Sequence, residues 1–323
     1  MTKRQIVFGL LMSALMACTP AARAQNFPDK PVRIVVPYDP GATTDTVARL
    51  VAQELGQKWK QPVIVENRPG ASGGIGASYV SRSAPDGYAL MVTPAGVLTT
   101  NQFLYSDLLY DPETLVPVSL IATTPLVLVN RPSSNITTLQ QLIDYAKANP
   151  GKLNFGSQGV GNVAHLAPEQ VSMLTGAKMA HIPYKGSAPA MTALLAGNVD
   201  FIMCLDMYSA GPQIQAGKLR AVASCDMNRN PRLPGVPAIA ETVPGFDAKG
   251  WFGMFAPPDT PSQIVEKISR DIAEVMKSDA VKKRLAAQSI DPVGSTPQYL
   301  GDLVKRERAR WGQVIRDEHI KVD

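Results

Sequence analysis

The chain alternates short runs of apolar residues with longer segments in which apolar residues return every three or four positions. The run VRIVVPY at 32–38 predicts a strand, and the segment at 44–59 carries its apolar residues on one helical face. Further strand-like runs follow at 61–67 and 88–94. Strands and helices that alternate in this way predict an α/β fold with parallel strands.

The run LVPVSLIATTPLVLVNR at 115–131 is too long and too rich in β-branched residues for one ordinary strand. It predicts that the chain leaves one lobe here and enters another, where the alternation restarts. The next helix should begin with a capping box of Thr137 and Gln140 and end at Gly151. A segment rich in Pro and Gly at 230–246 then returns the chain to the first lobe. The predicted domains are a first lobe of residues 25–122 and 233–323 and a second lobe of residues 123–232.

The first residues of the chain predict export. Two basic residues precede an apolar stretch at 6–17, and the small-residue pattern ARA ends at Ala24. This order is typical of a secretory signal peptide, here residues 1–24, and it implies a periplasmic location. The sequence LMAC, which ends at Cys18, resembles a lipoprotein box and gives a second, less favoured alternative.

Charge and cysteine content narrow the possible functions. Removal of the signal peptide takes away three basic residues and no acidic ones, which lowers the net charge from +5 to +2. So small a charge argues against nucleic acid as a partner. The two cysteines that remain, Cys204 and Cys225, either form a disulfide in an oxidising compartment or serve as two buried apolar residues.

Two loops stand out because each follows a predicted strand and precedes a predicted helix. They are YDPGATTD at 38–45 and GSQGVGN at 156–162. Free backbone N–H groups and the positive end of the helix dipole suit each loop to a carboxylate or phosphate. If the lobes face each other, both loops converge on one small anion. The alternative is that both are ordinary helix starts, for which Thr43, Thr44 and Asn162 are suitable caps.

Enzyme-like patterns in the chain lack the context that they need. GVGNVA at 159–164 resembles a dinucleotide fingerprint but has no acidic residue about 20 positions later. GASGG fits a nucleophile motif around Ser72, but NRP separates it from the preceding strand. Among the histidines, His165 is best placed, and we favour a role as ligand donor over one as general base. The sequence therefore predicts no catalytic residue, no metal and no cofactor.

Several longer motifs, in order along the chain, point to one family: FPDKPVRIVVPY, PVIVENRPGASGGIGA, HIPYKGSAPAMTALLAGNVD and WFGMFAPP. Together they resemble the Bug family, the substrate-binding receptors of tripartite tricarboxylate transporters. The resemblance implies a periplasmic-binding-protein (Venus-flytrap) fold, with two α/β lobes joined by a two-strand hinge. It also implies a small carboxylate ligand (a di- or tricarboxylate, an amino acid or an aromatic acid) and delivery to membrane permease subunits. We expect a monomer that is not an enzyme.

The resemblance places the two carboxylate-gripping loops at Tyr38–Asp45 and Ser157–Asn162. The chain departs from the family pattern at Tyr38 (usually Phe), at Asp39 and Ala42, and at Asn162 (commonly Ser or Thr), which leaves the identity of the acid open. Pro168 is also unusual, and it should kink the following helix or shift its start. The candidate ligand-binding residues are Tyr38, Gly41, Ala42, Thr43, Thr44, Asp45, Thr93, Ser157, Gly159, Gly161, Asn162, His165 and Asp206.

Three charged residues near these loops have roles that the sequence leaves open. We expect Asp45 to cap its helix or order its loop, since an acidic residue beside an anion would repel it. Asp206 either receives an ammonium group or is a plain turn residue, and Lys185 is expected to be structural. Two other functions remain as alternatives: a ligand sensor for a membrane signalling protein, and a serine hydrolase that uses Ser72 or Ser157.

Overall fold

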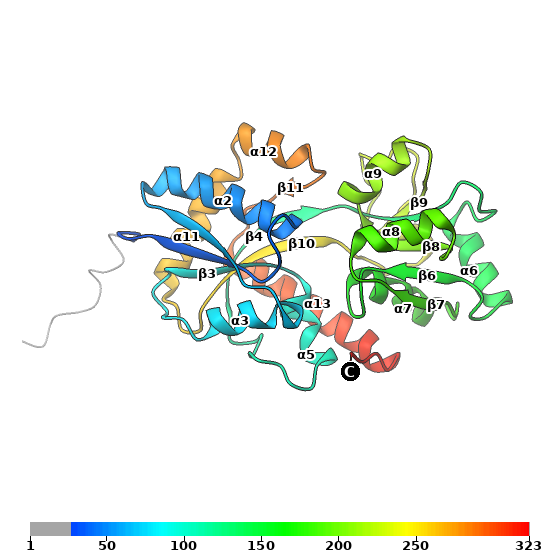
Figure 1. Cartoon of the computed structure of the whole chain (residues 1–323), viewed down its shortest axis with the longest axis horizontal. Helices are drawn as coiled ribbons and strands as arrows, with labels where there is room; N and C mark the ends of the chain where they lie inside the picture. Colours follow the sequence, from blue (N-terminus) through cyan, green and yellow to red (C-terminus); the bar gives the residue numbers. More distant parts are fainter. Residues whose placement is uncertain (1–26, 323) are drawn as a thin grey trace, which may run out of the picture.

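The computed structural model describes residues 27–322, so the predicted signal peptide and Cys18 lie outside the described residues. The described residues form two α/β lobes, each built around its own sheet (Figure 1). This arrangement confirms the predicted two-lobed α/β architecture. In this part of the chain, no helix is both long and apolar enough to cross a membrane.

The first lobe is built on a six-stranded sheet with the order β11-β4-β10-β3-β1-β2. Strand β1 runs parallel to β2 and β3, whereas β10 runs antiparallel to β3 and β4. The strands are β1 (Val32–Val36), β2 (Val63–Asn67), β3 (Ala89–Pro94), β4 (Val116–Thr124), β10 (Gly250–Ala256) and β11 (Asp291–Pro292). The helices are α2 (Thr43–Trp59), the 3-10 turn η2 (Ala71–Gly73), α3 (Gly74–Ser81), α4 (Gly96–Thr99), α5 (Asn101–Leu104), α11 (Ser262–Val275), α12 (Asp279–Ala286) and α13 (Pro297–Asp317).

The second lobe is built on a five-stranded sheet with the order β7-β6-β8-β5-β9. Strand β6 runs parallel to β7 and β8, and β5 runs antiparallel to β8 and β9. The strands are β5 (Leu126–Asn130), β6 (Asn154–Ser157), β7 (Ala180–Pro183), β8 (Phe201–Asp206) and β9 (Arg220–Ser224). The helices are α6 (Leu139–Ala148), α7 (Val163–Thr175), α8 (Ser187–Ala196), α9 (Met207–Gln215) and α10 (Ile239–Thr242).

The long apolar run at 115–131 forms two strands in different sheets, as predicted. Strand β4 ends at Thr124, and after Pro125 the chain continues directly as β5 in the second sheet. The return crossing enters β10 at Gly250, which pairs with Thr124. A Cβ atom at Gly250 would overlap the Thr124 side chain, so this glycine allows the two crossing strands to lie close together. The lobes are thus joined by two adjacent crossings, which Figure 1 shows between the two sheets.

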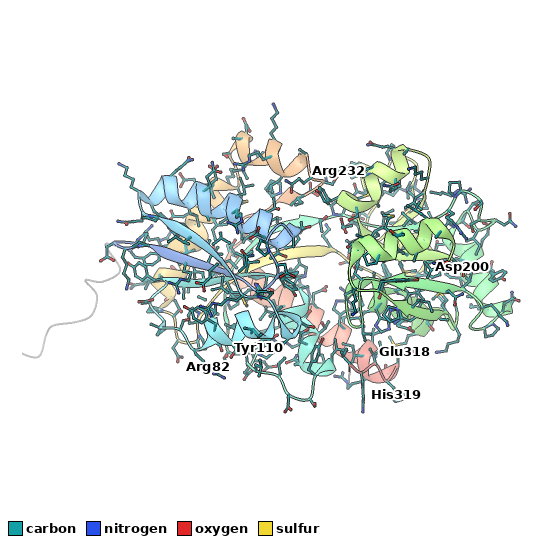
Figure 2. The ribbon with its side chains drawn as sticks, in the orientation of Figure 1. Arg82, Tyr110, Asp200, Arg232, Glu318 and His319 are labelled. Atoms are coloured by element: carbon teal, nitrogen blue, oxygen red, sulfur yellow. The ribbon has the colours of Figure 1, made fainter. Side chains whose placement is uncertain are left out.

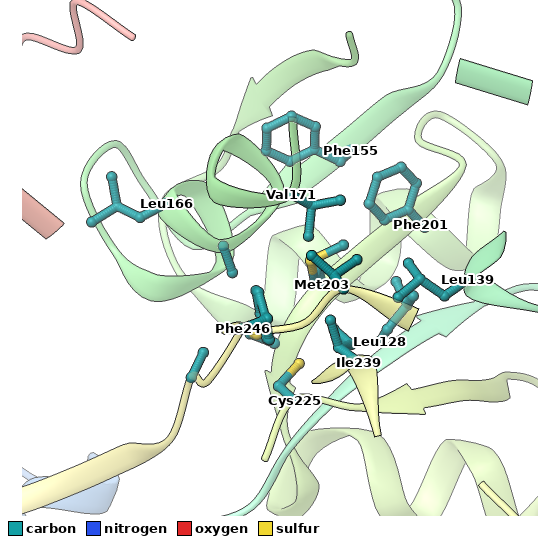
Figure 3. Packing of buried hydrophobic residues seen from close by; sticks show 14 of the residues in the cluster. Leu128, Leu139, Phe155, Leu166, Val171, Phe201, Met203, Cys225, Ile239 and Phe246 are labelled. Atoms are coloured by element: carbon teal, nitrogen blue, oxygen red, sulfur yellow. The ribbon is translucent and has the colours of Figure 1, made fainter. Parts of the chain in front are cut away.

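The core of the second lobe reaches further along the chain than the predicted boundary at residue 232. Phe246 is buried in this core with Leu128, Phe155 and Phe201 (Figure 3). The end of α13 also packs there through Trp311. The domain boundaries remain a prediction, and this packing favours a return to the first lobe near residue 249.

Both cysteines are buried and unbridged. Cys204 lies on β8 and Cys225 directly follows β9, with β5 between those two strands in the sheet. Each side chain belongs to the apolar core of the second lobe. In this structure they therefore act as two small buried hydrophobic residues.

The ends of two helices differ from the prediction. The capping box of α6 is formed by Thr138 and Gln141, one residue later than expected, because Thr138 is the last extended residue before the helix. The helix ends at Ala148 with Asn149 as its C-cap, and Gly151 instead makes a turn in which its N–H group bonds to the Lys178 carbonyl at 2.9 Å. Helix α7 begins at Val163 and runs through Pro168, so the proline does not delay its start.

Candidate functional site

Residues 37–44, the turn and the first two residues of α2, are called loop 1 below and are held from behind by Asp45 on α2. Its Oδ2 atom accepts hydrogen bonds from the Gly41 backbone N–H at 2.9 Å and from Arg49 Nε at 2.8 Å. Its Oδ1 atom accepts a bond from Asn67 Nδ2 at 2.9 Å, and the same nitrogen donates to the Tyr38 carbonyl at 3.0 Å. Asp45 is only 3% exposed, so its carboxylate contacts these donors and hardly any solvent. The side chain orders loop 1.

Burial by itself would raise the pKa of Asp45, but the hydrogen bonds from Arg49, Gly41 and Asn67 outweigh it. The pKa of Asp45 therefore lies below its usual value, and the residue is ionised at neutral pH. Because its negative charge is compensated by these donors, it repels an anion beside loop 1 less than an unpaired carboxylate would.

Helix α2 begins without a capping side chain. Its N-cap residue is Ala42, and Thr43 and Thr44 are already the first helical residues. The two threonines therefore do not cap the helix, although their residue type had suggested that role. The helix start keeps backbone donors that no capping side chain occupies, together with the positive end of its dipole. Figure 1 shows this end of α2 directed toward the second lobe.

Tyr38 is half-buried and packs against both apolar clusters of the first lobe. Burial raises the pKa of its phenol, and the neighbouring Tyr105 adds to the shift. The hydroxyl of Tyr105 in turn lies 2.5 Å from the Ser72 hydroxyl, on the glycine-rich turn. Tyr38 thus forms a fixed, mostly apolar side of loop 1.

The loop at 158–162, called loop 2 below, is fixed by different contacts. Asn162 is the N-cap of α7, and its Oδ1 atom accepts bonds from the N–H groups of Ala164 at 2.9 Å and His165 at 3.2 Å. The Gly161 N–H donates to His165 Nδ1 at 3.1 Å. Gly161 is buried at φ +78, and a Cβ atom there would overlap Leu104 of the first lobe. Loop 2 is therefore seated directly against α5.

Two histidines stack behind loop 2. The ring centroids of His165 and His181 are 3.7 Å apart with planes inclined by 10°. His181 Nε2 lies 2.6 Å from the Ser157 hydroxyl, and His165 Nε2 lies 3.9 Å from Glu169. Burial lowers the pKa of His165 to about 3, with a further contribution from His181, and burial lowers the pKa of His181 to about 4. Both rings are therefore neutral near pH 7.

The contact between Ser157 and His181 raises the possibility that Ser157 is a nucleophile, but the surroundings of this serine argue against that role. Ser157 has no exposed surface, and its hydroxyl also lies 3.0 Å from the Gly159 carbonyl. Within the described residues, no carboxylate bonds to His181. The other candidate, Ser72, contacts Tyr105. Neither serine has the base and acid that a triad requires.

The remaining candidate residues are spread over other parts of the two lobes. Thr93 is completely buried, and its hydroxyl donates to the Pro94 carbonyl at 3.3 Å. Asp206 caps α9, accepting a bond from the Ser209 N–H at 2.9 Å. Lys185 is exposed at the start of the α8 segment. Asp206 therefore has a local structural role whether or not it meets a ligand.

Sequence reasoning missed several residues that fix the loops. Arg49 lies four positions after Asp45 on the same helix, a spacing that could have identified the pair. Asn67 ends the strand beside β1, where neighbouring parallel strands bring their carboxyl ends together. Leu104 carried no local signal, because its contact with Gly161 joins segments far apart in the chain. The described residues contain no cluster of three or more side chains that could hold a metal ion.

Comparisons with known proteins identify the family of this chain. Residues 47–320 match the model of the tripartite tricarboxylate transporter family receptor. The chain is 37% identical to protein BugT from Bordetella pertussis, over 100% of this chain and 99% of that one.

Two ligand-bound structures are similar along nearly the whole chain. One is Rpa4515 from R. palustris with adipate, at 35% identity and a TM-score of 0.79, covering 92% of this chain and 100% of that one. The other is MatC from Rhodopseudomonas palustris with bound malate, at 32% identity and a TM-score of 0.74, covering 90% and 100% of the two chains. By family match, identity and fold together, this chain belongs to the tripartite tricarboxylate transporter receptor family.

Proposed function

We propose that this protein is a periplasmic receptor that grips a small carboxylate between loop 1 and loop 2. The observation that carries the proposal is the uncapped start of α2, where Asp45 binds the loop from inside and leaves the outer donors free. Family membership supports a solute-binding role, and two relatives were solved with the dicarboxylates adipate and malate.

The two loops would contribute unequally. Loop 1 offers the N–H groups of Thr43 and Thr44 at a helix end without a side-chain cap. In loop 2 the Asn162 oxygen already accepts from the N–H groups of Ala164 and His165, so Asn162 would meet a ligand through its Nδ2 group. His165 would act from behind by fixing Gly161, in place of the direct ligand contact expected from the sequence. Loop 1 is therefore the stronger anion site.

The energetics of such a grip are sufficient for tight binding. A micromolar dissociation constant corresponds to a binding free energy of about 8 kcal/mol. Each hydrogen bond to a charged group contributes roughly 1.5–3 kcal/mol. About four or five bonds shared by the two loops would reach that value after the cost of association. A ligand that bridges both lobes would also favour a closed arrangement about the two crossings.

Delivery to permease subunits in the membrane completes the proposal, with the receptor acting as a monomer. Its export would depend on the signal peptide at 1–24. Binding would leave the ligand chemically unchanged, because neither serine candidate has a complete set of catalytic partners.

The proposal is tested on freshly purified protein by native mass spectrometry, followed by calorimetric titration with adipate, malate and citrate. We expect one acid per chain, released unchanged when the protein is denatured. No bound acid together with no heat from any of the three acids would contradict the proposal. A chemically altered acid, with the change abolished by Ser157→Ala, would favour the hydrolase instead.

A further inference from the structure

Hydroxyl side chains gather at the edge of the first sheet from which loop 1 leaves. Strands β1 and β2 run parallel, so loop 1 and the turn after β2 begin at the same edge, the one at which ligands bind in open α/β sheets. A Cβ atom at Gly73, which ends η2, would lie 3.4 Å from the Tyr38 hydroxyl. This distance places the side chain of Tyr38 beside the glycine-rich turn.

The hydroxyl of Tyr38 is not used by the fold. Within the described residues it makes no hydrogen bond, and it is not among the unpaired side-chain atoms that are closed off from solvent. Burial and the neighbouring Tyr105 raise the pKa of this phenol, so it keeps its proton at neutral pH. A neutral phenol both donates and accepts hydrogen bonds. Tyr38 therefore offers a half-buried but reachable polar group to a solute.

Ser72 and Tyr105 extend this polar surface toward the second lobe. Their hydroxyl oxygens lie 2.5 Å apart, a contact that uses one hydrogen and leaves the other free to donate. Ser72 is exposed, whereas Tyr105 packs against the core of the second lobe. Tyr105 directly follows α5, whose Leu104 supports Gly161 of loop 2. We call the hydroxyls of Tyr38, Ser72 and Tyr105 the hydroxyl cluster, and it lies between the two loops.

The turn that carries Ser72 is held in place by the side chains behind it. Asn101 Nδ2 donates to the Ser72 carbonyl at 2.9 Å and to the Tyr110 hydroxyl at 3.2 Å. Tyr110, labelled in Figure 2, donates in turn to the Val97 carbonyl at 2.6 Å. Ala71 and Ser72 have φ values of 48 and 50, a left-handed backbone that persists where the surroundings impose it. The position of the Ser72 hydroxyl is therefore fixed before a ligand arrives.

The hydroxyl cluster suits a neutral oxygen group better than a second carboxylate. Within the described residues, no Lys or Arg side chain bonds to any of its three hydroxyls. The charged residue next to Tyr38 in the chain is Asp39, which is exposed and would repel a second anion. A hydroxyl or carbonyl group can accept from the cluster without that repulsion.

We propose that the hydroxyl cluster determines which acids the receptor accepts, by binding a hydroxyl or carbonyl group of a ligand whose carboxylate is held by loop 1. This inference rests on the proposed carboxylate site and narrows its ligands to hydroxy and oxo acids. An acid with an apolar group at the same place leaves the Tyr38 hydroxyl without a partner, and it binds more weakly for that reason. Tyr38 is the specificity-determining residue, because its hydroxyl has no other partner.

Calorimetry with paired acids tests the proposal, because the members of each pair differ only in the distal group. The pairs are γ-hydroxybutyrate with butyrate and ω-hydroxycaproate with caproate, which sample two spacings between the carboxylate and the hydroxyl. Adipate and ω-aminocaproate carry a carboxylate and an ammonium group in place of the distal hydroxyl. Tyr38→Phe removes the phenol oxygen alone. Tyr145→Phe, at a position on α6 that is 45% exposed, is the matched control.

We expect wild type to bind at least one hydroxy acid at least threefold more tightly than its parent acid. Tyr38→Phe should bring this ratio close to one and leave the affinity for the parent acid unchanged, while Tyr145→Phe should keep the wild-type ratio. Equal affinities within both pairs, or the wild-type ratio in Tyr38→Phe, would overturn the proposal. Tighter binding of adipate or ω-aminocaproate than of ω-hydroxycaproate would overturn the selection of a neutral group. No binding of any acid would contradict the receptor proposal itself.

Discussion

The Nδ1 atom of His165 accepts a hydrogen bond from the Gly161 backbone N–H at 3.1 Å, so the first turn of α7 holds the loop that precedes it. This bond requires a neutral imidazole, because a protonated ring has no free acceptor. The loop geometry and the protonation state of His165 are therefore linked.

Replacing His165 with Phe tests this link. Phenylalanine can keep the stacking on His181 but leaves the Gly161 N–H without an acceptor, which costs about 1–3 kcal/mol. We expect a lower free energy of unfolding and weaker carboxylate binding, measured by urea denaturation and calorimetry. His319→Asn is the control and should change neither quantity, because the position is exposed and asparagine tolerates its left-handed backbone (φ 52).

The pH dependence of stability should follow from the same cluster. The pKa values of His165 and His181 fall to about 3 and about 4 in the fold, from 6.5. Between those values and 6.5 the unfolded chain binds more protons, so stability decreases as the pH falls through this window. Burial, with a smaller contribution from Glu318, raises the pKa of Glu169 to about 7 from 4.5, which has the opposite effect.

On acidification the two histidines lower the free energy of unfolding and the one carboxyl raises it. The net result should be a decrease of about 1.4 kcal/mol for each unit by which the pH falls between 6.5 and 4.5. Glu169→Gln should steepen this slope and His165→Phe should flatten it. Urea denaturation at several pH values measures the slope. The same slope in both variants and in wild type would show that the cluster does not titrate in this way.

The seat of loop 2 on the first lobe can be tested at Gly161. Gly161 and Gly176 share φ +78, but a Cβ atom would overlap Leu104 only at Gly161, because nothing lies within 4 Å at Gly176. Alanine at either position should cost about 1–2 kcal/mol for the left-handed backbone. We expect Gly161→Ala to cost at least 1 kcal/mol more in urea denaturation and to weaken binding. Equal losses at the two positions would mean that the Leu104 contact is unimportant.

Asn162 combines a capping role with a proposed ligand contact, and two substitutions separate them. Aspartate keeps the cap but places a negative charge beside the ligand, so Asn162→Asp should remain stable and lose at least tenfold in carboxylate affinity. Asn162→Ala should lose about 0.5–2 kcal/mol of stability with the cap. If Asn162→Asp bound the acid as wild type does, Asn162 would have only the capping role.

Local sequence patterns predicted the elements that form within one segment. They missed the contacts between residues that are far apart in the chain. Apolar periodicity gave β1, α2 and the division of the run at 115–131 into β4 and β5. It also identified both loops, because a strand followed by a glycine-containing turn and a helix start is a local pattern. It could not show that Asn67 holds loop 1 or that Leu104 supports loop 2, since those contacts join separate segments.

His181 illustrates the same limit. Its position among β-branched and apolar residues gave no reason to expect a polar role. Parallel pairing of β7 with β6 sets it opposite Phe155, and it thereby reaches the Ser157 hydroxyl at 2.6 Å.

One carboxylate ligand should be held jointly by the free backbone N–H groups at the start of α2 and by the Asn162 side chain of loop 2. Hydrogen exchange of the amides at Thr43–Asp45 and at 158–163, followed by NMR during titration with adipate, malate or citrate, tests it most directly. We predict that amides of both loops become protected together, with the same dissociation constant that calorimetry gives for that acid. Protection of only one loop, or of neither while the acid still binds, would contradict the account.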